Sequence, residues 1–174
     1  MKYNIDVNGV TAMPHLSVTA RKERHMEFNT TLFGKIDVSD DKILEFPQGI
    51  LGFEELKRFT LTFDAEKSAP TGLNFMVSLD EPAFMLPVVT AVAVKPDYSP
   101  EISAEVEKAI GPLTEENVLV LVTMTIPEDI TKMTVNLNAP IIINIDTNKA
   151  VQSVVENEGY DIKYPIYDFL KSNQ

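Results

Sequence analysis

Residues 118–126 read VLVLVTMTI, and this stretch decides the fold class. Val, Met and Ile occupy every second position from Val118 to Ile126, so these side chains share one face of an extended strand. Residues 58–64, RFTLTFD, repeat the pattern with Phe and Leu on one face and threonines on the other. A period of two residues predicts half-buried β-strands. The chain is therefore expected to be mainly β.

Further strands are expected on both sides of these two. Alternating patterns predict strands at 32–38, 73–79 and 133–138, and apolar runs predict strands at 83–94 and 141–145. The one credible helix is Ser99–Ile110, with Ser99 as N-cap, Pro100 in the first turn and Gly111 at the end. This pattern predicts a compact antiparallel β-barrel or β-sandwich, a single domain with one short helix. The expected core contains Phe59, Leu61, Phe63, Val120, Val122, Val135 and Leu137.

The composition is that of a soluble domain with an acidic surface. The 174 residues carry a net charge of −11 and include no cysteine, which excludes disulfides, thiolate metal sites and cysteine nucleophiles. The charge opposes contact with nucleic-acid phosphates, and no apolar stretch approaches the length of a membrane span. A cytoplasmic location is expected. Residues 1–28, which hold His15, His25 and a basic cluster, are expected to form an N-terminal extension to a domain at 29–174.

The sequence shows no catalytic constellation. Both histidines lie in the extension, so the expected core has no histidine for general base chemistry, and the glycines form no phosphate-binding loop. Adjacent acids, such as Asp80 and Glu81, could serve a carbohydrate-binding or hydrolysing β-domain. Solvated turns are the simpler interpretation, because the chain has no tryptophan to form a sugar platform. We expect no enzyme activity, no metal and no cofactor, and keep the carbohydrate function as the alternative.

Residues 46–54, FPQGILGFE, form the most unusual stretch. Pro47 and Gly49 favour a tight turn, and Gly52 permits a second bend. The apolar residues within this loop have two interpretations. They either tuck over the end of the barrel, or they form an exposed rim that binds a partner.

The same loop carries a resemblance to the FliW family of flagellar assembly factors. It is supported in order by TLFGKIDV at 31–38, ILEFPQGILGFE at 43–54, SLDEPAF at 78–84 and TVNLNAPIIIN at 134–144, and it spans about residues 30–168. The resemblance implies a compact β-barrel that works by binding other proteins. It implies that the chain binds newly made flagellin and, once flagellin is exported, binds the translational regulator CsrA and relieves its repression of flagellin mRNA.

Candidate contact residues follow from physical argument and not from the family. An amphipathic flagellin helix would need an apolar groove, for which we predict Phe46, Ile50, Leu51, Phe53 and Phe84. CsrA binds RNA and should present a basic face, for which we predict the acidic residues Asp80, Glu81, Asp97, Glu101 and Glu105. The protein is expected to be a monomer.

Overall fold

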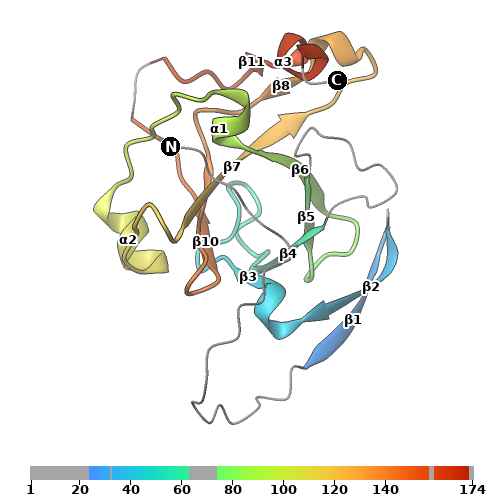
Figure 1. The fold of residues 1–174 in the computed structure, drawn as a ribbon. Coiled ribbons are helices and arrows are strands. Elements are labelled where there is room, and N and C mark those ends of the chain that lie inside the picture. Colours follow the sequence, from blue (N-terminus) through green and yellow to red (C-terminus); the bar gives the residue numbers. More distant parts are fainter. Residues whose placement is uncertain (1–23, 32, 63–73, 157–158, 173–174) are drawn as a thin grey trace, which may run out of the picture.

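The computed structural model describes residues 24–31, 33–62, 74–156 and 159–172 (Figure 1). The strands are β1 His25–Thr30, β2 Gly34–Ser39, β3 Ile43–Glu45, β4 Arg58–Thr62, β5 Asn74–Ser78, β6 Met85–Thr90, β7 Val118–Thr125, β8 Thr134–Val135, β9 Ile141–Asn144, β10 Lys149–Gln152 and β11 Tyr164–Pro165. The α-helices are α1 Ala91–Val94, α2 Ala104–Ile110 and α3 Tyr167–Ser172, and single 3₁₀ turns are η1 Asp40–Lys42 and η3 Ile130–Lys132.

Seven strands close into a barrel. Their order is β7-β6-β5-β4-β3-β10-β9, and β9 pairs back onto β7 from Val118↔Asn144 to Leu121↔Ile141. Every neighbouring pair is antiparallel except β3 and β10, which pair in parallel at Glu45 and Lys149. Strands β8 and β11 extend β7 beyond the barrel. The prediction of a mainly β, barrel-like single domain is confirmed, and the barrel is preferred over the sandwich because its sheet closes on itself.

The two-residue period places one face of each strand inside the barrel. Leu119 and Leu121 of β7 face the interior core, whereas Val120 and Val122 pack in a second core outside the barrel wall. The interior core comprises Leu44, Phe46, Ile50, Leu56, Phe59, Met76, Val88, Leu121, Ile141, Ile143 and Ala150. The core prediction is confirmed for the buried residues Phe59, Val122, Val135 and Leu137. Leu61 and Val120 are half-buried, and Phe63 lies outside the described residues.

Helices cover the outside of the barrel. Val106 and Ile110 of α2 pack against Ile142 and Val151 in a third cluster. The prediction of a helix from Ser99 is wrong in its first five residues, because α2 begins at Ala104 with Ser103 as its N-cap. The amide of Ser99 instead donates to the Tyr160 hydroxyl (2.9 Å), a tertiary hydrogen bond that helps to hold this segment outside the helix.

Two further boundaries differ from the sequence patterns. The apolar run at 83–94 is not one strand, because β6 ends at Thr90 and α1 follows, with Ala91 and Val94 buried one helical turn apart. Strand β1 begins at His25, inside the segment predicted as an extension, and pairs with β2 from His25↔Ser39 to Thr30↔Gly34. This hairpin lies beside the barrel in Figure 1. Residues 1–23 lie outside the described residues.

Candidate functional site

The loop between β3 and β4 closes one end of the barrel. Phe46 and Ile50 are buried in the interior core, and between them Gly49 donates its amide to the Phe46 carbonyl (3.0 Å) in a left-handed conformation, φ +75°. The Phe53 amide donates to the Ile50 carbonyl (2.8 Å), which closes a second tight turn. Phe46 and Ile50 therefore cannot contact a partner directly. This corrects their predicted role: they anchor the loop, because their side chains fill the barrel end.

The loop buries some of its apolar residues and leaves others exposed. Leu51 and Phe53 remain 49% and 45% exposed, although Ile50 before them and Leu56 after them are buried. The Phe53 ring packs on the half-buried Phe84 ring from the β5–β6 turn, with centroids 4.6 Å apart. We call Leu51, Phe53 and Phe84 the apolar face. The two phenylalanines are in direct contact, and Leu51 joins them by its exposure and its place in the same loop.

An aromatic chain connects this face to the core. Phe84 lies 6.1 Å from Phe59, and Phe59 lies 4.9 Å from Phe46, both measured between ring centroids and both edge-to-face. Such pairs contribute roughly 0.5–1.5 kcal/mol each beyond their buried area. The Phe53 ring is thus exposed on one side and supported from beneath on the other.

Asp80 joins the two segments that form the apolar face. Its Oδ2 accepts the backbone amides of Lys57 and Arg58, both at 2.8 Å, and its Oδ1 accepts Nε of Arg58, also at 2.8 Å. The side chain is 23% exposed. Burial opposes ionisation of Asp80, but the hydrogen bonds from Lys57 and Arg58 outweigh it and hold the pKa of this carboxyl below its usual value.

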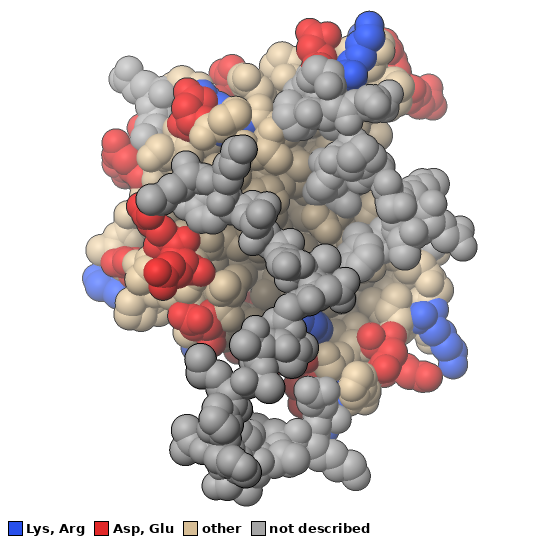
Figure 2. All heavy atoms as spheres, viewed as in Figure 1, with Lys and Arg blue, Asp and Glu red and all other residues tan. Residues whose placement is uncertain are grey.

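The predicted CsrA residues separate into two groups. Asp80 and Glu81 lie in the β5–β6 turn, on the right side of the barrel in Figure 1. Asp97 and Glu101 lie on the segment that leads into α2, and Glu105 lies in the first turn of α2, on the left. Acidic residues gather over this left side in Figure 2, with few basic residues among them. The structure therefore does not bring all five residues onto one surface. We call residues 97–105 the acidic segment.

Two tyrosines fix the acidic segment to the barrel wall. The buried Tyr98 hydroxyl donates to the Leu137 carbonyl (2.6 Å), and its ring packs on Tyr160 at 4.6 Å between centroids. Burial, together with the neighbouring Tyr160, raises the pKa of Tyr98 far above its usual value, so this phenol remains a donor. Asp97 pairs with Lys95 (2.6 Å), which lowers the pKa of Asp97. Sequence reasoning missed both tyrosines, because only the fold brings position 160 to position 98.

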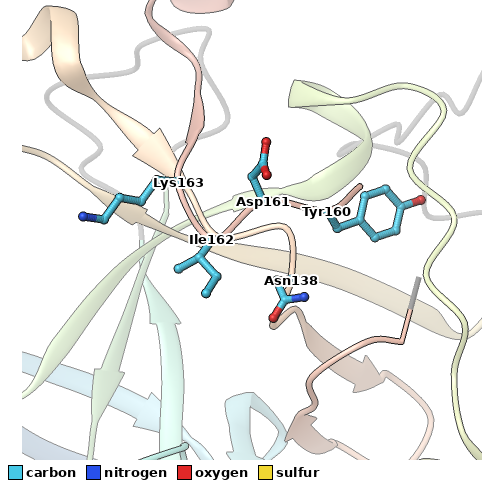
Figure 3. Close-up of a pocket in the computed structure, with 5 residues that line it drawn as sticks. All are labelled: Asn138, Tyr160, Asp161, Ile162 and Lys163. Atoms are coloured by element: carbon cyan, nitrogen blue, oxygen red, sulfur yellow. The ribbon is translucent and has the colours of Figure 1, made fainter. Parts of the chain in front are cut away.

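A shallow hollow lies beside this tyrosine pair. Asn138 and residues 160–163 line it, and their side chains diverge in Figure 3: Tyr160 and Lys163 point in opposite directions, and Asp161 points away from Asn138. A second hollow is lined by residues that include Leu61, Leu119 and Ile145. Neither hollow includes the apolar face, which is a surface where Phe53 covers Phe84, and not the groove that we predicted.

Three of the adjacent acids lack the raised pKa that a general acid for carbohydrate hydrolysis needs. The pKa values of Asp41, Glu54 and Asp129 are all lowered, chiefly by hydrogen bonds from the Ser39 hydroxyl, the Gly52 amide and the Thr131 hydroxyl respectively. A general acid at neutral pH needs a raised pKa. Within the described part of the chain, no group of three or more His, Asp or Glu residues could hold a metal ion.

None of the helices that the structure describes is long and apolar enough to cross a membrane.

Comparison with known proteins agrees with the sequence resemblance. Residues 27–166 match the family model described as FliW protein. The chain is 43% identical over 150 residues to the flagellar assembly factor FliW of Lachnospira eligens, covering 86% of this chain and 99% of that protein. It is 42% identical over 143 residues to the protein of the same name from Lachnoclostridium phytofermentans, covering 82% and 92%.

A solved structure shows the same architecture. The crystal structure of a flagellar assembly factor FliW superposes with a TM-score of 0.74 at 26% sequence identity, and the match covers 81% of this chain and 96% of that chain. The closed barrel, the family match over most of the chain and the full-length relatives lead to one conclusion: this chain belongs to the FliW family of flagellar assembly factors.

Proposed function

We propose that this chain is a cytoplasmic binding protein, not an enzyme, that binds flagellin and, when free of flagellin, binds and antagonises the translational regulator CsrA. Translation of flagellin would then follow its export. Membership of a family of flagellar assembly factors supports this role. The two partners, flagellin and CsrA, are those that the family resemblance implies. The observation that carries the flagellin part is the apolar face.

Three properties make the apolar face suited to a partner. Leu51 and Phe53 are about half exposed, at the tip of a loop whose base is buried. Exposed apolar side chains that cluster are a known mark of interaction sites. The Phe53 ring is held against Phe84, so little side-chain entropy remains to be lost on binding. An amphipathic flagellin helix could lay its apolar side on this face.

Replacing Phe53 with alanine tests the proposal. Truncating an anchor side chain costs about 2 kcal/mol or more, so flagellin affinity should fall about 30-fold. The fold should survive, because Phe53 is half exposed and closes no core. Titration calorimetry with purified flagellin measures the change, alongside circular dichroism of the variant.

The matched control is Ile130→Ala. Ile130 is also a large apolar side chain, 57% exposed, but it lies in η3, away from the β3–β4 loop. Its loss should leave flagellin affinity within about twofold, the scatter that surface substitutions usually give. A well-folded Phe53→Ala protein with unchanged affinity would remove the apolar face from the flagellin site.

For CsrA we propose the acidic segment. Asp97, Glu101 and Glu105 are exposed on a stretch that Tyr98 anchors to the barrel wall, so the charges have a defined position. Charge complementarity of this kind raises the association rate and sets orientation more than it adds affinity. Asp80 does not belong to this site, because Lys57 and Arg58 already occupy its oxygens.

Reversing the charge at Asp97, Glu101 and Glu105 to lysine should weaken CsrA binding and leave flagellin binding nearly unchanged. The wild-type CsrA complex should also weaken with salt, since the screening length falls from about 10 Å at 0.1 M to about 3 Å at 1 M. Stopped-flow association rates at both salt concentrations give the measurement. Equal losses for both partners, or CsrA binding that ignores salt, would restrict the acidic segment to a role in solubility.

A further inference from the structure

We infer that Asp80 is a positioning residue for the apolar face, and that flagellin affinity depends on Asp80 although its side chain does not contact the partner. The inference rests on the proposed flagellin site. Charge alone would assign Asp80 to a surface that binds a basic partner. The inference gives Asp80 a structural role instead.

The Asp80 carboxylate is saturated by the chain itself. Two consecutive backbone amides, those of Lys57 and Arg58, converge on Oδ2, and the Arg58 guanidinium donates to Oδ1. Hydrogen bonds to an ionised acceptor are about twice as strong as neutral ones. A cation on a partner would have to displace Arg58 to reach this carboxylate. Asp80 is therefore built to hold the chain and not to receive a ligand.

One side of this contact carries Phe84. The Ser78 hydroxyl accepts the amides of Asp80 (3.1 Å) and Glu81 (3.0 Å), and the Phe84 amide donates to the Glu81 carbonyl (2.9 Å). The Ser78 amide in turn donates to the Phe84 carbonyl (3.0 Å). The β5–β6 turn is thus closed on itself, and the position of Asp80 determines that of the Phe84 ring.

The other side of this contact carries Phe53. The Lys57 carbonyl accepts the Phe46 amide (2.7 Å), and the Lys57 ammonium donates to the Pro47 carbonyl (3.0 Å), so Lys57 ties the two ends of the loop together. The Leu56 amide donates to the Phe53 carbonyl (3.1 Å). The hydrogen bonds from Lys57 and Arg58 to Asp80 therefore also hold in place the end of the loop that carries Phe53.

Asp80 lies where the strand ladder stops. Strands β4 and β5 pair up to Phe59↔Ser78, and one more backbone bond joins the Leu79 amide to the Arg58 carbonyl (2.8 Å). Beyond that point the carboxylate supplies the next connection between the two segments. Its loss should let the β3–β4 loop and the β5–β6 turn move apart, and this would separate the Phe53 and Phe84 rings.

The first arm of the test needs no partner. The chain contains no tryptophan, so Phe53→Trp introduces a single tryptophan at the apolar face, whose emission can be excited apart from that of the tyrosines. Adding Asp80→Asn, which removes the charge that pairs with Arg58, should shift the emission to longer wavelength and increase quenching by acrylamide. Arg58→Gln removes one of the three donors and should shift the emission in the same direction by less. It also keeps the test decisive if Asp80→Asn fails to fold.

The control is Asp129→Asn. Asp129 likewise accepts a local backbone amide, from Thr131 at 3.2 Å, and pairs with a nearby cation, Lys132 at 3.3 Å, but it lies in the loop that begins η3. A general loss of stability would affect both variants. Only a positioning role at the apolar face would distinguish Asp80→Asn from Asp129→Asn in the tryptophan signal.

The second arm measures binding with residue 53 unchanged. Asp80→Asn should weaken flagellin binding roughly tenfold, about the effect of one charge-assisted hydrogen bond, and leave CsrA binding within about twofold. Loss of CsrA binding with flagellin binding retained, or a tryptophan signal that Asp80→Asn and Arg58→Gln do not change, would overturn the inference. If the wild-type chain does not bind flagellin at all, the proposed function fails, whereas a signal specific to Asp80→Asn would still support the positioning role.

Discussion

Gly49→Ala is expected to lower the free energy of unfolding by about 2–5 kcal/mol and to abolish the apolar face. A Cβ atom at position 49 would lie 2.5 Å from the carbonyl oxygen and 2.6 Å from the Cα atom of Glu54. Both are backbone atoms, so no side-chain rotation relieves the contact. The φ of +75° adds the cost of a left-handed conformation for a residue with a Cβ. The loop must move, and Phe53 with it.

Gly52→Ala is the matched control three residues along. Gly52 has a similar φ, +83°, but a Cβ atom there would meet nothing within 4 Å. Its replacement should cost only the conformational penalty, about 1–2 kcal/mol. Urea unfolding monitored by circular dichroism gives both free energies, and flagellin titration gives the effect on the face. Equal losses for the two variants would mean that the close approach of Gly49 to Glu54 does not constrain the loop.

Phe59→Ala is expected to cost about 3–5 kcal/mol of stability, a large part of the 5–15 kcal/mol typical of a domain. Phe59 is fully buried, and its ring contacts both Phe46 and Phe84. Its removal leaves a cavity in the barrel interior and takes away the support beneath Phe84. Flagellin binding should therefore weaken even under conditions in which the variant remains folded.

Leu61→Ala provides the comparison for this core prediction. Leu61 lies on the same strand and the same face as Phe59, but it is only half-buried. Less apolar surface returns to water when it is truncated, so the loss should stay below about 2 kcal/mol. Denaturant unfolding of each variant gives a midpoint and a slope, and together these give the two free energies of unfolding that the prediction compares. A Phe59→Ala protein as stable as Leu61→Ala would show that the barrel collapses around the missing ring.

Local pattern was sufficient for β4, β5, β7 and β9 and for the part of the 83–94 run that forms β6, but it did not predict the short barrel strands β3 and β10. Residues 118–126 alternate because β7 has one face toward the interior core and the other toward the second core, and a period of two follows from the pleat of any strand. The sequence also predicted the fold class, the turn at residues 46–54 and the family. It did not predict the parallel pairing of β3 with β10, because strand pairing across a distance in sequence leaves no local trace.

Helix boundaries depended on contacts that the sequence does not show. Ser99 and Pro100 form a good helix start by local rules, yet α2 begins only at Ala104. Tyr160, 61 residues away, accepts the Ser99 amide, and Tyr98 is anchored to Leu137. These tertiary hydrogen bonds outweigh a capping preference of about 1 kcal/mol.

For the candidate site, too, the sequence determined some properties and the tertiary structure determined others. The sequence by itself determined which residues are apolar, which are acidic and where the chain must turn, because these follow from residue type and from the φ that glycine permits. Only the tertiary structure decided which of them are exposed: the closing barrel buries Phe46 and Ile50, leaves Leu51 and Phe53 exposed, and places Phe84 beneath Phe53. It also removed Asp80 from the acidic surface, because two backbone amides and a guanidinium converge on that carboxylate only when β4 and β5 are paired.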